Sequence, residues 1–184
     1  MCLGVDAFAA QLRAAGYDAN AYEDILGHFV AVRIERDYAS NARHQPLVLV
    51  GYSSGAVTAV AIARRLNRSH IPVDLLVTLD PALPEVVPGN VRVCLNYYER
   101  IIPGLPLLSG TMMKAEKPVT LQNVRLKQSN HLTIDESPEM KTAVTARIAI
   151  LSATANTRAN SAATITGSPA RERSAHLGRG AWHD

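Results

Sequence analysis

Apolar and polar positions alternate with two different periods along the first 151 residues of the chain. Short runs of branched apolar residues predict strands at residues 17–22, 47–50, 73–79, 91–97 and 119–127. Apolar residues at helical spacing predict helices at residues 5–15, 25–42, 56–66 and 137–151. Strands that alternate with helices indicate an α/β fold, in which helices flank a mainly parallel sheet.

The chain of 184 residues is long enough for one domain with a buried core. We assign residues 1–151 to that domain. From residue 152 onward the sequence is rich in Ala, Ser, Thr, Gly and Arg, with only scattered apolar residues. Such a composition buries too little surface to offset the entropy lost on ordering, so residues 152–184 are predicted to be a disordered tail.

Charge and cysteine content exclude several classes of function. The net charge is +3, which does not indicate a nucleic-acid partner. We expect Cys2 and Cys94 to be free thiols in a reducing compartment, although a disulfide between them is possible. There is no long apolar segment and no signal-peptide pattern, so we expect a cytoplasmic protein that is not an integral membrane protein. The oligomeric state is left open.

The pentapeptide G-x-S-x-G occupies residues 51–55, between the strand predicted at 47–50 and the helix that follows. This order is typical of a nucleophile elbow, in which a tight turn presents the central serine, Ser53, to a cleft. We expect Gly51 and Gly55 to allow the close approach of strand and helix. The alternative is an ordinary glycine-rich turn without chemistry.

A serine nucleophile needs a base, and the base needs an acid that orients it. Among the six histidines, His131 lies between the last predicted strand and the last helix, where it can reach the same sheet edge as Ser53. Asp80 lies at the carboxyl end of the strand predicted at 73–79, which follows the helix predicted at 56–66, and it is the leading acid. Asp135 is the rival acid. The alternatives are that His131 is an ordinary surface histidine and that Asp80 only forms a turn before Pro81.

The chain resembles the α/β-hydrolases, and more narrowly the small bacterial lipase- and thioesterase-like hydrolases. The resemblance covers about residues 4–151 and rests on GYSSG, on DLLVTLDP and on NHLTID. It implies that Ser53 is the nucleophile, His131 the base and Asp80 the orienting acid. It also implies that the backbone amide of Ser54 is one oxyanion donor.

The resemblance further implies a small-molecule ester or thioester substrate and no cofactor. The sequence agrees with the last point, since it contains no metal-ligand spacing and no phosphate-binding glycine loop. In the family, a strand and a loop that supplies a second oxyanion amide precede the first helix, and this chain begins beside that helix. We therefore expect an N-terminally truncated, minimal fold that lacks the first strands. The alternative function is that of a catalytically impaired hydrolase-fold binding module or a truncated product.

Overall fold

The computed structural model describes residues 3–40, 45–99, 111–127 and 129–166. Four parallel strands form its main sheet, in the order β1-β2-β4-β6. Their bounds are β1 Val48–Tyr52, β2 Val73–Leu79, β4 Val91–Tyr98 and β6 Thr120–Arg125. The predicted α/β fold with a mainly parallel sheet is therefore confirmed.

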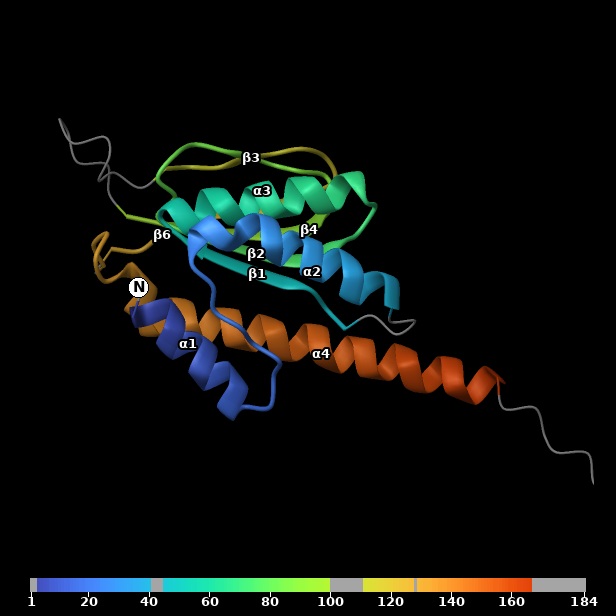
Figure 1. The fold of residues 1–184 in the computed structure, drawn as a ribbon. Coiled ribbons are helices and arrows are strands. Elements are labelled where there is room, and N and C mark those ends of the chain that lie inside the picture. The colour runs from blue at the N-terminus through green and yellow to red at the C-terminus, as the bar shows by residue number, and fades with distance from the viewer. Residues whose placement is uncertain (1–2, 41–44, 100–110, 128, 167–184) are drawn as a thin grey trace, which may run out of the picture.

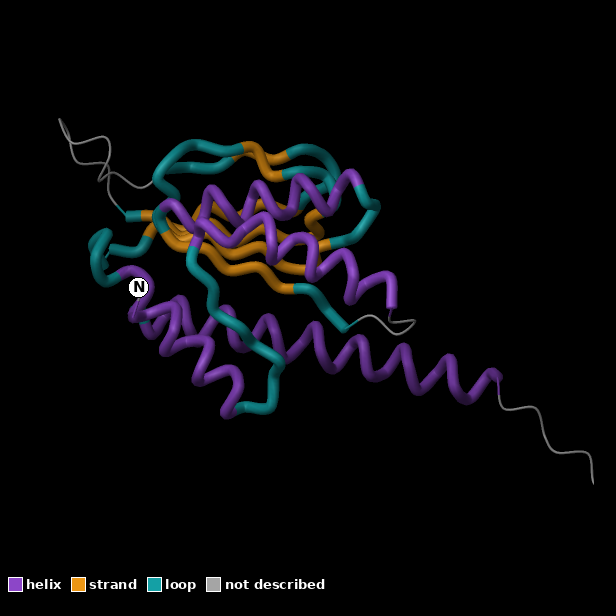
Figure 2. The backbone as a smooth tube through the Cα atoms, in the orientation of Figure 1, coloured by secondary structure: helices purple, strands orange, loops and turns teal. Residues whose placement is uncertain are grey.

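Helices cover both faces of this sheet (Figures 1 and 2). One face is covered by η1 (Asp24–Leu26), α2 (Gly27–Ser40) and α3 (Ser54–Arg68). The other face is covered by α1 (Leu3–Ala14), η3 (Ile134–Glu136) and α4 (Pro138–Thr166). The short pair β3 (Val86–Val87) and β5 (Lys114–Ala115) forms a second, two-stranded sheet outside α3 (Figure 1).

The strand β2 lies inside the sheet and explains why its sequence is apolar almost throughout. Leu75 and Val77 belong to the core beneath α1 and α4, whereas Leu76 belongs to the core beneath α3. All three side chains are fully buried. A parallel strand covered on both faces needs apolar residues on both, so strict alternation is absent.

The strand register aligns the carboxyl ends of the strands. Tyr52 of β1 is paired with Leu79 of β2, Leu79 is paired with Tyr97 of β4, and Tyr97 is paired with Val124 of β6. Neighbouring strands lie about 4.8 Å apart, so the residues that follow this row gather at one edge of the sheet. Ser53 and Asp80 are the next residues of their strands.

One row of the sheet is polar although it lies in the core. Thr78 Oγ1 donates to Asn96 Oδ1 at 2.8 Å, and Asn96 Nδ2 donates to Asn123 Oδ1 at 2.7 Å and to the Thr111 carbonyl at 2.9 Å. Asn123 in turn accepts the Met113 N–H at 2.9 Å. The network fastens residues 111–113 to the sheet, and the side chains of Thr78, Asn96 and Asn123 each find a partner within it.

Three differences from the sequence predictions have identifiable causes. The strand predicted at residues 17–22 is wrong. Tyr17 and Ala19 face the core while Asp18 and Asn20 face solvent, so burial alternates as in a strand although this segment pairs with no neighbouring strand. The strands β3 and β5 were not predicted, because two residues are too few for a period to be visible.

The third difference concerns the end of the domain. α4 continues to Thr166, so the predicted boundary between residues 151 and 152 falls inside a helix. The alanine-rich composition that suggested disorder also favours helix. Residues 167–184, the rest of the predicted tail, lie outside the described residues.

Cys94 is a free thiol in β4 and is fully buried. Burial raises the pKa of this thiol to about 12, so it stays neutral near pH 7. Cys2 lies outside the described residues, so the prediction of free thiols is confirmed for Cys94 alone. Among the helices that the structure describes, none is both long and apolar enough to cross a lipid bilayer.

We expect the substitution Asn96→Leu to destabilise the fold by about 2–4 kcal/mol, because it leaves the Thr78 hydroxyl and the Thr111 carbonyl buried without their partner. Urea unfolding of the full chain measures this loss. Asn67→Leu is the matched control, since Asn67 is exposed near the end of α3. Equal losses in the two variants would contradict the structural role of the polar row.

Candidate active site

Ser53 stands at the junction between β1 and α3. Its backbone has φ 52° and ψ −116°, which is a strained conformation for a residue with a side chain. Its N–H donates to the Leu79 carbonyl at 2.9 Å, and its own carbonyl accepts the N–H groups of Ala56 at 3.1 Å and Ala82 at 3.3 Å. These bonds hold the partly exposed serine on a sharp strand-to-helix turn, as a nucleophile elbow requires.

The two glycines of the pentapeptide differ in their surroundings. A Cβ added at Gly51 would lie only 2.2 Å from the carbonyl oxygen of Gly55, so strand and helix approach too closely there for any side chain. A Cβ added at Gly55 would meet no atom within 4 Å. The expectation that both glycines permit the close approach is therefore supported for Gly51 and wrong for Gly55.

Asp80 lies beside Ser53 at the end of β2. Its backbone also has a positive φ, 45°, and its N–H donates to the Tyr97 carbonyl at 2.8 Å. Its side chain is only 1% exposed. Both carboxylate oxygens have partners: Oδ2 lies 2.6 Å from His131 Nδ1, and Oδ1 accepts the Glu99 N–H at 3.4 Å.

His131 is carried by a loop, and local bonds shape that loop. The side-chain oxygen of Asn130 accepts the Leu132 N–H at 2.9 Å. The backbone carbonyl of Asn130 accepts the N–H groups of Thr133 and Ile134, both at 2.9 Å. The His131 ring lies 5.2 Å from the ring of Tyr52, centroid to centroid. A carboxylate at Nδ1 favours the tautomer with its proton there, which leaves Nε2 as the basic nitrogen.

The structure therefore brings Asp80 and His131 into direct contact and places Ser53 on the adjacent strand end. Among the hydrogen bonds of the described residues, none joins the Ser53 hydroxyl to His131. In proteins without bound substrate, catalytic hydrogen bonds are often long and tighten only when substrate binds. The three predicted residues share one edge of the sheet, and one of the two bonds of a triad is formed.

Two further residues lie at this edge, and the sequence assigned neither of them a role in catalysis. The hydroxyl of Tyr52 donates to the His131 carbonyl at 2.5 Å, and Glu99, which follows β4, is only 6% exposed. Tyr52 is the last residue of β1 and Glu99 directly follows β4, so both lie at the end of a parallel strand, as Ser53 and Asp80 do. That shared position is the signal that could have identified them.

The rival acid, Asp135, lies elsewhere. It is buried in η3, and its carboxylate packs against the start of α1, where a Cβ at Gly4 would come within 2.3 Å of Oδ2. A negative charge at the first turn of a helix is stabilised by the helix dipole. Of the two acids weighed, Asp80 is the one hydrogen-bonded to His131.

Ser54 is the first residue of α3. The first amides of a helix have no carbonyl one turn earlier to bind, and they carry the positive end of the helix dipole. The Ser54 N–H follows the nucleophile directly, so it is suited to receive an oxyanion formed at the Ser53 side chain. A second donor is not identified among the described residues.

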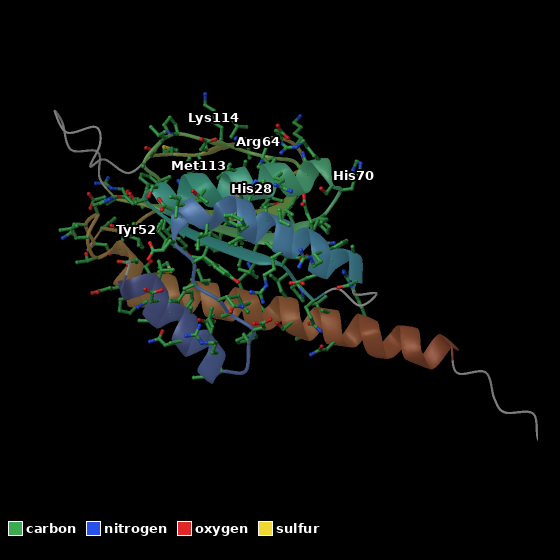
Figure 3. The ribbon with its side chains drawn as sticks, in the orientation of Figure 1. His28, Tyr52, Arg64, His70, Met113 and Lys114 are labelled. Atoms are coloured by element: carbon green, nitrogen blue, oxygen red, sulfur yellow. The ribbon has the colours of Figure 1, made fainter. Side chains whose placement is uncertain are left out.

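A different hollow, of about 510 Å³, lies between η1, α2 and α3. It is lined in part by His28, Thr58 and Arg65, and Figure 3 shows His28 on α2, apart from Tyr52. Arg65 is already paired there, because its guanidinium bonds Glu35 at 2.7 Å and thereby lowers the pKa of that carboxyl. In the part of the chain that the structure describes, no cluster of three or more His, Cys, Asp or Glu residues could hold a metal ion.

Replacing the two glycines one at a time tests the elbow. Gly51→Ala should destabilise the protein by about 1–3 kcal/mol, because the methyl group forces strand and helix apart. Gly55→Ala should leave stability unchanged or raise it by up to about 1 kcal/mol, since alanine is the better helix former. Thermal and urea unfolding measure both effects. Similar destabilisation by the two variants would contradict this account of the turn.

The sequence matches no protein-family model and no curated protein. Neither comparison therefore assigns the chain to a family. The case for a function rests on the residues at the carboxyl edge of the sheet, and above all on the contact between Asp80 and His131.

Proposed function

We propose that the protein is a serine hydrolase of the α/β-hydrolase type, which cleaves an ester or thioester through Ser53, His131 and Asp80. The observation that carries the proposal is the 2.6 Å contact between Asp80 Oδ2 and His131 Nδ1, formed at the strand end next to Ser53. A buried carboxylate that orients an imidazole beside a serine on a sharp turn is the arrangement that serine hydrolases use.

In the first half of the reaction, Ser53 Oγ attacks the carbonyl carbon of the substrate while His131 Nε2 takes the hydroxyl proton. The carbonyl π electrons move to oxygen, and the Ser54 N–H stabilises the resulting negative charge. Asp80 holds the imidazolium in place by its bond to Nδ1. The intermediate then collapses: the bond to the alcohol or thiol breaks, and that group leaves with the proton from Nε2.

In the second half, water attacks the acyl group on Ser53. His131 Nε2 accepts a proton from this water, and a second tetrahedral intermediate forms at the same oxyanion donor. Its collapse breaks the bond between the acyl carbon and Ser53 Oγ, and the serine regains its proton from Nε2. The products are a carboxylic acid and the alcohol or thiol, so neither a metal nor a redox cofactor enters the balance.

Backbone strain supports the same residues. Positive φ in residues other than glycine costs about 1–3 kcal/mol each and tends to occur at functional sites. Among the described residues it occurs at Ser53, His70 and Asp80. Two of these three residues are the proposed nucleophile and the proposed acid, and the third lies just after the end of α3.

A fluorophosphonate probe, which phosphonylates activated serines, tests the nucleophile and the base in the full chain. We expect labelling of the wild type at Ser53, none in Ser53→Ala, and a loss of at least about 10³-fold in rate in His131→Gln. The same order should hold for the hydrolysis of p-nitrophenyl esters.

Two matched variants control for non-specific effects. Ser54→Ala keeps its backbone amide and should be labelled like the wild type. His70→Gln should be too, because His70 is exposed and lies at the opposite end of α3 from Tyr52 (Figure 3). A folded wild type that neither reacts with the probe nor hydrolyses the esters would favour the binding module instead.

The acid has its own test. Asp80→Asn keeps the size of the side chain but removes the charge that orients His131, so we expect the labelling rate to fall by about 10³–10⁴-fold. Asp135→Asn should leave the rate close to that of the wild type, because its carboxylate faces the start of α1. The reverse pattern would show that Asp135 is the acid. Circular dichroism spectra of both variants check that each is folded.

A further inference from the structure

Tyr52 is a residue of the G-x-S-x-G pentapeptide to which the proposed reaction gives no task. It is the last residue of β1 and directly precedes Ser53. Its side chain is partly buried and packs against the core beneath α1 and α4. A tyrosine with its ring against a core usually brings its hydroxyl to a polar partner, so the position of that hydroxyl is informative.

The hydroxyl of Tyr52 reaches the main chain of the proposed base. It donates to the His131 carbonyl at 2.5 Å, which is short for a bond between a hydroxyl and a carbonyl. β1 and β6 lie at opposite edges of the four-stranded sheet, and His131 lies in the loop after β6. The bond therefore joins this loop to the far edge of the sheet.

The ring of Tyr52 makes a second contact with the same residue. Its centroid lies 5.2 Å from that of the His131 imidazole, and the two ring planes are inclined by 36°. An aromatic ring within about 6 Å attracts a positive charge, and the imidazole carries one while it holds the proton of the serine. One side chain thus contacts both the main chain and the ring of the base.

The loop of His131 is braced within itself, but those bonds do not set its position over the sheet. The Asn130 N–H donates to Thr133 Oγ1 at 3.0 Å, and the Asn130 carbonyl accepts the Thr133 N–H at 2.9 Å. Two other bonds tie the loop to strand ends: Asp80 bonds the ring nitrogen Nδ1, and Tyr52 bonds the carbonyl. A single bond would leave rotation about it free, whereas two bonds from different strands restrict it.

We propose that Tyr52 is a positioning residue for His131: its hydroxyl and its ring together hold the imidazole beside the strand end that carries Ser53. Tyr52 and Ser53 are consecutive residues, so the backbone that places the nucleophile also places the group that holds the base. The contacts exist whatever the reaction is, and the consequence for catalysis rests on the proposed function.

Two NMR signals of His131 test the contacts without any activity. The resonance of the carbonyl carbon reports the hydrogen bond, and the imidazole protons report the ring current of Tyr52. Tyr52→Phe should shift the carbonyl resonance upfield and leave the imidazole protons close to their wild-type positions, whereas Tyr52→Leu should shift both. An unchanged carbonyl resonance in Tyr52→Phe, or unchanged imidazole protons in Tyr52→Leu, would overturn the proposal.

Tyr22→Phe is the matched control for the loss of a hydroxyl. The Tyr22 hydroxyl accepts a bond from Arg33 Nη1 at 2.9 Å, and both residues are exposed. Tyr22 lies just before η1, in the helical layer on the other face of the sheet. This variant should leave both His131 signals and the activity unchanged.

Kinetics tests the positioning itself. The final extent of labelling by the fluorophosphonate probe counts the folded sites, whereas the rate of labelling reports how well the base is placed. Tyr52→Phe should still be labelled completely, but its labelling rate and its kcat for p-nitrophenyl esters should fall by about 10-fold with little change in KM. Tyr52→Leu, which also loses the ring, should lose about 100-fold.

The outcomes separate positioning from folding and from the proposed function. If Tyr52 only stabilised the fold, its variants would be labelled to a smaller extent while the folded fraction reacted at the wild-type rate, and this result would refute positioning. A wild type that does not react with the probe would refute the proposed function and its consequence here. The NMR signals would still establish or refute the hold of Tyr52 on His131.

Discussion

The buried carboxylate of Asp80 is the constraint on which the carboxyl edge of the sheet depends. An ionised group with a side chain only 1% exposed costs several kcal/mol unless bonds replace its water. Here the replacements are His131 Nδ1 and the Glu99 N–H, which come from two other segments of the chain. Removing one partner from such a group typically costs 3–5 kcal/mol, so the carboxylate itself holds the His131 loop over the strand ends.

Strain at this edge is compensated by the parallel ladder. Ser53 and Asp80 both adopt unfavourable positive φ values, yet both still donate their N–H groups to the neighbouring strand, to Leu79 and to Tyr97. The hydrogen bonds of the sheet thus continue one residue beyond the regular strands. This continuation lets the backbone turn sharply while the two side chains stay on adjacent strand ends, where serine and acid must lie to share one histidine.

The accuracy of the sequence predictions follows from the range of the interactions involved. The bounds predicted for β2 are confirmed, because full burial on both faces leaves a continuous apolar run. The strand predicted at residues 17–22 was wrong, because a segment that buries every second residue without a partner strand shows the same apolar–polar alternation as a strand. Asp80 and His131 could be paired in advance because parallel strands end at one edge. The bond from the Tyr52 hydroxyl to the His131 carbonyl depends on how a loop folds back over the sheet, which no local pattern encodes.

These energies also bear on the choice between a hydrolase and a binding module. Replacing both partners of a buried hydrogen bond by apolar groups of the same shape can be nearly neutral or stabilising, and strained residues are readily relieved by substitution. A protein that only bound a partner would gain stability by losing the Asp80–His131 pair and the strain at Ser53. Their joint presence at one edge is costly for a scaffold and useful for a catalyst, which must hold its base and its nucleophile in advance of the reaction. This balance is the physical reason for preferring the hydrolase.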